Sequence, residues 1–248
     1  MASLSGRIAL VTGASRGIGY QTALALAAEG AHVIAVARTV GGLEELDDQI
    51  KEIGGEATLV PLDLSDMPAI DRLGGAVNER WGKLDILVAN AAMLGTISPL
   101  AYVEAKVFDR LMTLNVSSTW RLIRSLEPLL VKSDAGRAIV LTTSVAHSAR
   151  AFWGPYAASK AAVETMVRVW AEETAKTNLR VNSVDPGATR TAMRAQAYPG
   201  EDPDTLPKPA DIAGKLVALC GSDVTVTGKL YRVRESAFFD YAEPTPRG

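Results

Sequence analysis

The chain has few of the residues that build disulfides and metal centres. Its 248 residues include one cysteine, Cys220, and only two histidines, His32 and His147, which stand far apart in the sequence. A single cysteine excludes an intrachain disulfide and a cysteine-rich metal cluster, and the separated histidines do not form the pattern of a metal pair. We therefore expect a site without metal, in a protein of the reducing cytoplasm.

A large excess of one charge and long apolar runs are missing too. Acidic and basic residues nearly balance, which leaves a formal net charge of −2. Because neither a basic patch nor an acidic tail is present, nucleic acid is not an expected partner. No apolar run is long enough to span a membrane, and the short polar start, Met1–Gly6, does not have the pattern of a signal peptide. With 48% apolar residues the chain can bury a large core, and we expect one domain over residues 1–248.

What the chain does have begins with a strand, a glycine-rich loop and a helix. Residues 7–12 are apolar and β-branched, as in a buried strand, and residues 20–29 are rich in alanine and leucine, as in a helix. The loop between them has the spacing GxxxGxG, for which a plain tight turn is the alternative interpretation. Its place after the first strand favours dinucleotide binding, because glycines let the backbone approach a pyrophosphate and the amino end of the helix offers free N–H groups. The predicted cofactor residues of this loop are Gly13, Ser15, Arg16, Gly17, Ile18 and Gly19.

The next expected strand, residues 32–37, is followed by Arg38. NAD-binding proteins usually have an acidic residue here, which binds the adenosine ribose. A carboxylate would repel a 2′-phosphate, whereas the planar guanidinium of Arg38 can bind one, and Arg16 could supply a second positive charge. Two ordinary surface arginines are the alternative. The sequence therefore favours NADP(H) over NAD(H) as the cofactor.

Strands and helices alternate along the rest of the chain. Further strands are expected at residues 57–62, 84–89, 138–142, 179–184 and 229–233, and helices at residues 42–53, 66–81, 103–131, from Tyr156 onward, and at 210–220. This alternation predicts an α/β fold, a parallel doubly wound sheet with helices on both faces, whose ligands bind at the carboxyl ends of the strands. Site residues expected at those ends are Asp63, Leu64, Asn90, Ala91, Ser144, Pro186 and Gly187. Asp63 could bond an adenine or cap the next helix, and Asn90 could contact the cofactor or only stabilise the sheet.

Tyr156 and Lys160 carry the chemistry that the sequence predicts. Pro155 is tolerated in the first turn of a helix and indicates that a helix begins there. Residues four apart share a helix face, so the Lys160 ammonium would lie near the Tyr156 phenol and lower its pKa from about 10. Such a tyrosine can exchange a proton with a carbonyl or alcohol oxygen near neutral pH. For an isolated YxxxK pattern, two residues on a solvated helix face would be the better interpretation.

Taken together, these motifs resemble the short-chain dehydrogenase/reductase family over essentially the whole chain. The resemblance rests on Thr12-Gly13-Ala14-Ser15-Arg16-Gly17-Ile18-Gly19, Asn90-Ala91-Ala92, Asn115, Ser144, Tyr156-Ala157-Ala158-Ser159-Lys160 and Pro186-Gly187. It implies a single Rossmann-like domain with a seven-stranded parallel sheet in the order 3-2-1-4-5-6-7. It also implies a catalytic tetrad of Asn115, Ser144, Tyr156 and Lys160, and cofactor contacts from Thr189 and Thr191.

The resemblance assigns a role to each member of the tetrad. Tyr156 would act as general acid in reduction and as base in oxidation, while Lys160 would lower its pKa and hold the nicotinamide ribose. Ser144 would orient the substrate oxygen, and Asn115 would position a water that links Lys160 to solvent. Ser144 lies twelve positions before Tyr156, one fewer than is usual in the family. Counting alone would therefore select Thr143, whereas the local family pattern favours Ser144.

The substrate pocket is expected to contain His147, Trp153 and Met193, beneath a lid formed by residues 188–209. Such a long connection, rich in proline, glycine and acidic residues, is typical of an active-site lid, with a plain surface excursion as the alternative. Trp153 and Met193 predict an apolar wall, while His147 could contact a polar substrate group or belong only to the loop. In place of the VDGG-like segment common in the family, residues 231–235 read YRVRE and are followed by an aromatic tail.

The predicted function is that of an NADP(H)-dependent carbonyl reductase or alcohol dehydrogenase, an oxidoreductase that transfers hydride between nicotinamide and a small carbonyl or alcohol substrate. The alternative is an NADP(H)-binding sensor or scaffold protein without turnover. The family resemblance and an apolar stripe over residues 163–170 predict a homodimer or homotetramer, although the stripe could instead pack on the sheet.

Overall fold

The computed structural model describes residues 4–242, which fold around an eight-stranded sheet. The strands are β1 (Ile8–Thr12), β2 (His32–Ala37), β3 (Ala57–Pro61), β4 (Ile86–Ala89), β5 (Arg137–Leu141), β6 (Arg180–Asp185), β7 (Leu230–Arg232) and β8 (Ala237–Phe239). They lie in the order β3-β2-β1-β4-β5-β6-β7-β8. Strands β1 to β7 are parallel, as the alternation of strands and helices predicted.

The expectation of seven strands, all parallel, is wrong at one edge of the sheet. Strand β8 pairs antiparallel with β7, with Tyr231 opposite Phe238 and their rings 5.0 Å apart. Ser236, with φ of 51°, lies in the short connection that reverses the chain. A connection this short favours a hairpin, and the added strand covers the backbone groups of the β7 edge. The segment that departs from the family pattern thus forms a hairpin at the sheet edge.

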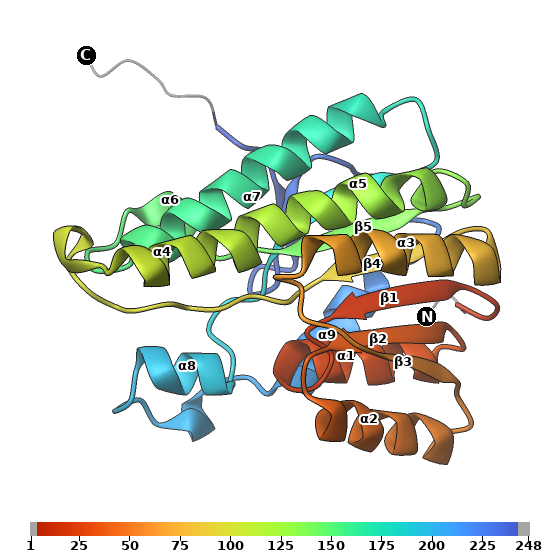
Figure 1. Ribbon diagram of the computed structural model, residues 1–248, viewed down its shortest axis with the longest axis horizontal. Helices are drawn as coiled ribbons and strands as arrows, with labels where there is room; N and C mark the ends of the chain where they lie inside the picture. Colours follow the sequence, from red (N-terminus) through yellow and green to blue (C-terminus); the bar gives the residue numbers. More distant parts are fainter. Residues whose placement is uncertain (1–3, 243–248) are drawn as a thin grey trace.

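Two layers of helices cover the sheet (Figure 1). Helices α1 (Gly17–Ala28), α2 (Val40–Glu52) and α9 (Pro209–Ala218) pack on one face, and α3 (Met67–Trp81), α5 (Ser118–Leu130) and α7 (Gly154–Glu173) on the other. Because alternate strand residues point to opposite faces, the apolar strands contribute to both cores. Of the two roles open for the stripe over residues 163–170, the structure shows packing on the sheet, with Trp170 only 1% exposed.

Shorter helical segments connect these layers. They are α4 (Ala105–Met112), a π-helical turn (Thr113–Ser117), α6 (Val145–Ser148), α8 (Ala192–Ala197), and two 3-10 turns, Leu100–Tyr102 and Pro203–Thr205. The helix expected over residues 103–131 is therefore divided by a π-helical turn, and the loop expected after Ser144 contains a short helix. Within residues 4–242, no helix is both long and apolar enough to cross a membrane.

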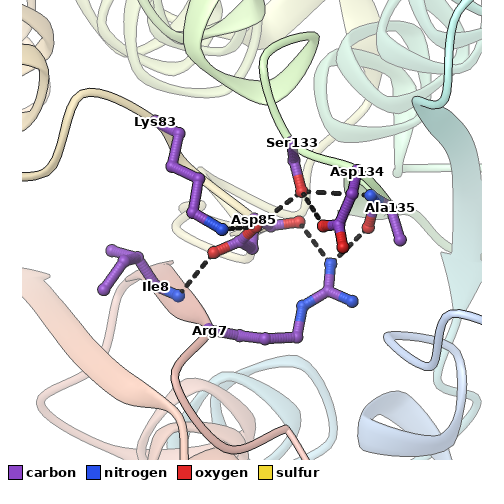
Figure 2. Close-up of polar contacts among 7 residues, drawn as sticks. All are labelled: Arg7, Ile8, Lys83, Asp85, Ser133, Asp134 and Ala135. Atoms are coloured by element: carbon purple, nitrogen blue, oxygen red, sulfur yellow. Dashed lines mark hydrogen bonds and ion pairs between the residues drawn. The ribbon is translucent and has the colours of Figure 1, made fainter.

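A buried aspartate fixes the edge of the sheet where β1 and β4 begin (Figure 2). The Asp85 carboxylate, fully buried, accepts hydrogen bonds from the Ile8 N–H at 2.9 Å, the Lys83 ammonium at 2.9 Å and the Ser133 hydroxyl at 2.5 Å. Arg7 donates to the backbone carbonyl of Asp85 at 3.4 Å. Burial alone would raise the pKa of Asp85, but the three donors outweigh it and hold that pKa below its usual value. The cavities described next lie at the opposite end of these strands, their carboxyl end.

Candidate active site

Two adjoining cavities lie where the parallel strands end. The larger, of about 580 Å³, extends along the glycine loop, and the smaller, of about 160 Å³, lies beneath α8. We call them the large and the small cavity. Six residues line both: Ile18, Thr142, Tyr156, Pro186, Thr191 and Met193. Because Tyr156 is common to both walls, a group in one cavity can meet a group in the other at this side chain.

The glycine loop packs directly against the end of β4. Gly13 has φ of +67°, and a Cβ there would lie 2.8 Å from Nδ2 of Asn90, while a Cβ at Gly19 would lie 2.4 Å from the same atom. Asn90 donates from Nδ2 to the carbonyl oxygen of Thr12 at 2.9 Å. Only glycine fits at these two positions, so Asn90 holds the loop in place as well as lining the large cavity.

The same loop leaves the amino end of α1 open to the large cavity. Arg16 precedes the helix, and no side chain caps its first N–H groups. Free N–H groups and the positive end of the helix dipole favour an anion such as a pyrophosphate. The cavity wall includes Ser15, Arg16, Gly17 and Ile18. These residues therefore fit the dinucleotide that the sequence predicts.

Two arginines line the large cavity beside the β2 end. Arg38 and Arg16 belong to its wall, and a guanidinium nitrogen of Arg38 lies 3.9 Å from a carboxylate oxygen of Asp63. Both partners of that contact are about half exposed, at 55% and 50%, so the pairing is weak and leaves Arg38 able to bind another anion. Asp63 itself accepts from the Ser65 N–H at 2.9 Å, and the cap of α3 is Asp66, which accepts from the Ala69 N–H. The capping role considered for Asp63 is therefore wrong.

Tyr156 and Lys160 share one face of α7, as predicted. The Lys160 ammonium lies 6.0 Å from the centre of the Tyr156 ring and donates to the carbonyl oxygen of Leu141 at 2.7 Å. Both residues are buried, with exposures of 9% and 4%, and both line the large cavity. The hydrogen bond fixes the ammonium at the end of β5.

Burial controls the ionisation of this pair. It raises the pKa of Tyr156 to about 12, with a smaller contribution from the charge of Asp185. It lowers the pKa of Lys160 to about 8, against the opposing charge of Glu164. The expected lowering of the Tyr156 pKa is therefore wrong, because burial disfavours the phenolate and the charge of Asp185 adds to that effect, while the Lys160 ammonium donates to Leu141. At neutral pH the phenol keeps its proton.

Asn115 lies in the π-helical turn and is 1% exposed. Its side chain accepts from the Met93 N–H at 2.9 Å and donates to the Met93 carbonyl and the Ser159 hydroxyl, each at 3.0 Å. Both the oxygen and the nitrogen of this buried amide thus have partners, as a buried polar group needs. π-helical turns often mark functional sites, and this one brings Asn115 next to the segment between Tyr156 and Lys160.

Both hydroxyl candidates before α7 line the small cavity. Thr143 accepts from the Val145 N–H at 3.5 Å, whereas Ser144, at the start of α6, is exposed and makes no side-chain cap. Ser144 thus keeps its hydroxyl available in the cavity, which favours it over Thr143 without excluding either.

The three predicted pocket residues are not brought together. Trp153 and Met193 line the small cavity, and the Trp153 ring centre lies 6.0 Å from that of Tyr156. His147 lines neither cavity, because its Nε2 lies 3.1 Å from a carboxylate oxygen of Glu164. Glu164 is buried, and burial raises its pKa. Glu164 was not predicted as a site residue, although the sequence places its carboxylate one helical turn after Lys160.

The predicted lid contains helix α8 and lies over the small cavity. Two ion pairs stabilise it: Arg194 holds Glu201 through two hydrogen bonds of 2.6 Å, and Arg190 holds Asp204. Figure 1 shows α8 standing apart from the two helical layers. Lid residues that line the small cavity include Ala188, Thr189, Thr191, Met193, Arg194, Ala197 and Tyr198.

Most of the predicted site residues thus meet around the two cavities. Those that line the large cavity are Gly13, Ser15, Arg16, Gly17, Ile18, Arg38, Leu64, Asn90, Ala91, Tyr156, Lys160, Pro186, Thr191 and Met193. Those that line only the small one are Ser144, Trp153, Gly187 and Thr189. Gly19, Asp63, Asn115 and His147 line neither. Besides Glu164, three residues of the small cavity were not predicted: Arg150, Tyr198 and Asp185.

Comparisons with known proteins agree with this architecture. The sequence profile described as short chain dehydrogenase matches residues 7–202. The uncharacterized oxidoreductase YciK of Escherichia coli is 41% identical over 223 residues, which are 89% of this chain and 88% of that protein.

Two solved structures are similar over nearly their whole length. A short chain dehydrogenase of Shigella flexneri, complexed with NADP, is 39% identical with a TM-score of 0.90, over 94% of this chain and 99% of that one. One from Escherichia coli, complexed with NADPH, is 40% identical with a TM-score of 0.88, over 93% of this chain and 98% of that one. The chain therefore belongs to the short-chain dehydrogenase/reductase family and is an NAD(P)-dependent oxidoreductase of that family.

Proposed function

We propose that the protein is an NADP(H)-dependent carbonyl reductase or alcohol dehydrogenase in which Tyr156 is the general acid and base. The observation that carries the proposal is the place of Tyr156 in the common wall of the two cavities. One cavity fits a dinucleotide, and the other is a smaller pocket with Trp153 and Met193 in its wall. A proton donor at their junction is what the reduction of a carbonyl requires.

The large cavity would hold the cofactor. The N–H groups of the glycine loop would bind its pyrophosphate, and Arg38 and Arg16 would bind a 2′-phosphate. Lys160 would hold the nicotinamide ribose, and Asn90, Ala91, Leu64, Thr189 and Thr191 would complete the contacts. When bound, the nicotinamide supplies hydride to the substrate or accepts it.

The small cavity would hold the substrate, a small molecule. Tyr156 would give its proton to the carbonyl oxygen during reduction and remove it from the alcohol during oxidation. Ser144 would donate a hydrogen bond to the same oxygen and orient it. Lys160, while charged, would stabilise the phenolate that remains after proton transfer. Asn115 would act indirectly. It would hold the π-helical turn in place and position a water beside Lys160.

The preference for NADP(H) rests on Arg38. A guanidinium that is only loosely paired at the end of β2 suits a phosphate better than a ribose hydroxyl. The solved relatives complexed with NADP and NADPH support the same choice. A cytoplasmic location and a homodimer or homotetramer stay predictions from the sequence.

The alternative, an NADP(H)-binding sensor or scaffold without turnover, needs only the large cavity. The small cavity argues against it, because a hydroxyl, a phenol and an apolar wall there have no use in cofactor binding alone. Oxidation of NADPH by a panel of carbonyl compounds would decide between the two.

Tyr156→Phe is the variant that tests the proposal. It should lower turnover by on the order of 10²–10⁴-fold, the usual contribution of a positioned proton donor, while cofactor binding changes little. Tyr20→Phe is a matched control, since Tyr20 is 8% exposed against 9% for Tyr156 and lines neither cavity. Normal turnover by Tyr156→Phe would show that the proton comes from another group.

A further inference from the structure

One arginine of the small cavity has no acidic partner. Arg150 and Arg194 both line this cavity. Arg194 is neutralised by Glu201 through two hydrogen bonds. For Arg150, no carboxylate lies within ion-pair distance among residues 4–242. Its side chain instead donates to the phenol oxygen of Tyr198, with its guanidinium carbon 5.4 Å from the Tyr198 ring centre and 6.0 Å from that of Trp153.

These contacts hold the guanidinium without neutralising it. A guanidinium has five N–H donors, and Tyr198 takes one of them. The two rings restrict the freedom of the side chain, so less entropy is lost when it binds a ligand. Arg150 is thus a prearranged positive group with donors to spare.

The loop that carries Arg150 is strained on both sides of it. Ala149 has φ of 43° and Phe152 φ of 73°, which are two of three non-glycine residues with positive φ between residues 4 and 242. Backbone strain of this kind concentrates at ligand clamps. The fold therefore holds Arg150 in a strained part of the short segment between Ser144 and Tyr156.

Trp153 links Arg150 to the reacting end of the cavity. Its ring centre lies 6.0 Å from the Tyr156 ring and 6.0 Å from the Arg150 guanidinium. A substrate with its carbonyl at Tyr156 would lay an apolar segment on Trp153 and reach Arg150 with its far end.

We propose that Arg150 binds a carboxylate or phosphate group of the substrate, so that the enzyme acts on oxo acids or phosphorylated ketones rather than on neutral carbonyl compounds. The inference rests on the proposed function, since it concerns the substrate of that same site. A guanidinium binds either oxyanion through paired N–H donors.

Matched substrates test the idea directly. Short, medium and long oxo-carboxylates are compared with their methyl esters, and keto phosphate monoesters with the corresponding keto alcohols. The wild type should favour the anion by about 10- to 100-fold in kcat/KM, the size expected of a hydrogen bond to a charged group. Arg150→Gln should raise the KM for the anion and leave the KM for its neutral counterpart unchanged. Arg150→Lys should restore part of the preference for the anion. The class of anion whose kcat/KM falls more in Arg150→Gln identifies the group that the natural substrate carries.

Arg80→Gln is the matched control, because Arg80 also stacks on a tryptophan, at 4.6 Å from the Trp81 ring centre, but lines neither cavity. Equal use of anion and ester by the wild type, or equal losses of both in Arg150→Gln, would overturn the inference.

Calorimetry separates this inference from the proposed function. An unreactive medium-chain carboxylic acid and its methyl ester are titrated into the enzyme saturated with NADP. Tighter binding of the acid that depends on Arg150 supports the anion site even if no carbonyl is reduced, in which case only the proposed function fails. Equal binding of acid and ester refutes the anion site even if both classes of ketone are reduced.

Discussion

Tyr156 and Lys160 are both pushed by burial toward their neutral forms. The Tyr156 pKa rises to about 12 and the Lys160 pKa falls to about 8, so near neutral pH the phenol is protonated and the amine still mostly charged. That combination suits reduction, in which the phenol must give up its proton and the resulting phenolate must be stabilised. As pH rises through about 8 the ammonium loses its charge, and the reduction rate should fall in the same range.

Lys160→Met keeps a side chain of similar length but removes the buried charge. The fall of the Lys160 pKa from 10.5 to about 8 corresponds to a cost of about 3 kcal/mol for the charged form in the folded protein. We expect an inactive variant that is at least as stable as the wild type near pH 7. The cost is full below about pH 8 and disappears as pH rises toward 10.5, so any advantage of the variant should shrink across that window.

Urea unfolding of both proteins near pH 7 and again near pH 10.5 measures that difference. A variant that is clearly less stable near pH 7 would mean that the hydrogen bond from Lys160 to Leu141 outweighs the cost of burying the charge.

Arg38→Asp tests the choice of cofactor at a single residue. The variant loses the guanidinium proposed to bind the 2′-phosphate and gains a carboxylate, which would repel that phosphate but accept hydrogen bonds from ribose hydroxyls. NADPH should bind at least ~10-fold more weakly, whereas NADH should change little or bind more tightly. Fluorescence titration of each cofactor gives the two affinities, and Arg72→Asp on the exposed surface of α3 is the control. If both cofactors lose affinity equally, Arg38 does not bind the phosphate.

At the scale of elements, the two ends of the parallel strands have different tasks. The beginnings of β1 and β4 are fixed by the closed network around Asp85, in which the carboxylate is fully buried and bound by three donors. Their carboxyl ends instead leave N–H groups and small residues around two cavities. Because this network fixes where β1 and β4 begin, it also holds the carboxyl ends of these strands in register, and the site depends on that register.

Asp85→Asn should therefore destabilise the protein by about 3 kcal/mol, because it removes the charge that pairs with Lys83 and turns one of the two buried acceptor oxygens into an N–H donor. The folded pKa of Asp85 is below its normal value of 3.8, so its contribution is present at neutral pH and is lost as pH falls through that lowered pKa. Thermal unfolding should show the deficit near neutral pH and a smaller one at strongly acidic pH.

Asp71→Asn is the control: Asp71 also has a lowered pKa, from hydrogen bonds with Arg121 and Ser125, but lies on the surface. A comparable loss in both variants would contradict the special role of the buried network.

How far the sequence predicts each element depends on how local its cause is. The glycine loop, the Tyr156–Lys160 helix and the apolar strands follow from residues close together in the chain, and the structure has all of them. The ion pair of His147 with Glu164 could not be predicted, because it joins α6 to the middle of α7. The pKa of Tyr156 escaped prediction for a related reason: the spacing shows the neighbouring ammonium but not the depth of burial, and burial raises this pKa.

At the scale of the whole molecule, the chain is a doubly wound sheet that ends in a hairpin. The switch in strand order between β1 and β4 opens the crevice in which ligands of such folds bind. This strand order followed from the family resemblance, and the parallel, doubly wound arrangement followed from the alternation of elements. The eighth strand did not, because only the pairing of Tyr231 with Phe238 across the β7–β8 turn shows that the aromatic tail returns to the sheet. The added strand covers the β7 edge, a position at which another chain could otherwise pair.

Transfer of isotope from cofactor to product tests the account of the whole molecule most directly. The enzyme is given NADPH that carries deuterium in both positions at the nicotinamide C4, together with a carbonyl compound that it reduces, and the mass of the product is measured by mass spectrometry. We predict one deuterium in the alcohol from the wild type and from Tyr20→Phe, and almost none in the same time from Tyr156→Phe, although all three proteins bind NADPH. Tight NADPH binding with no deuterium in any product, or equal transfer by Tyr156→Phe, would contradict the account.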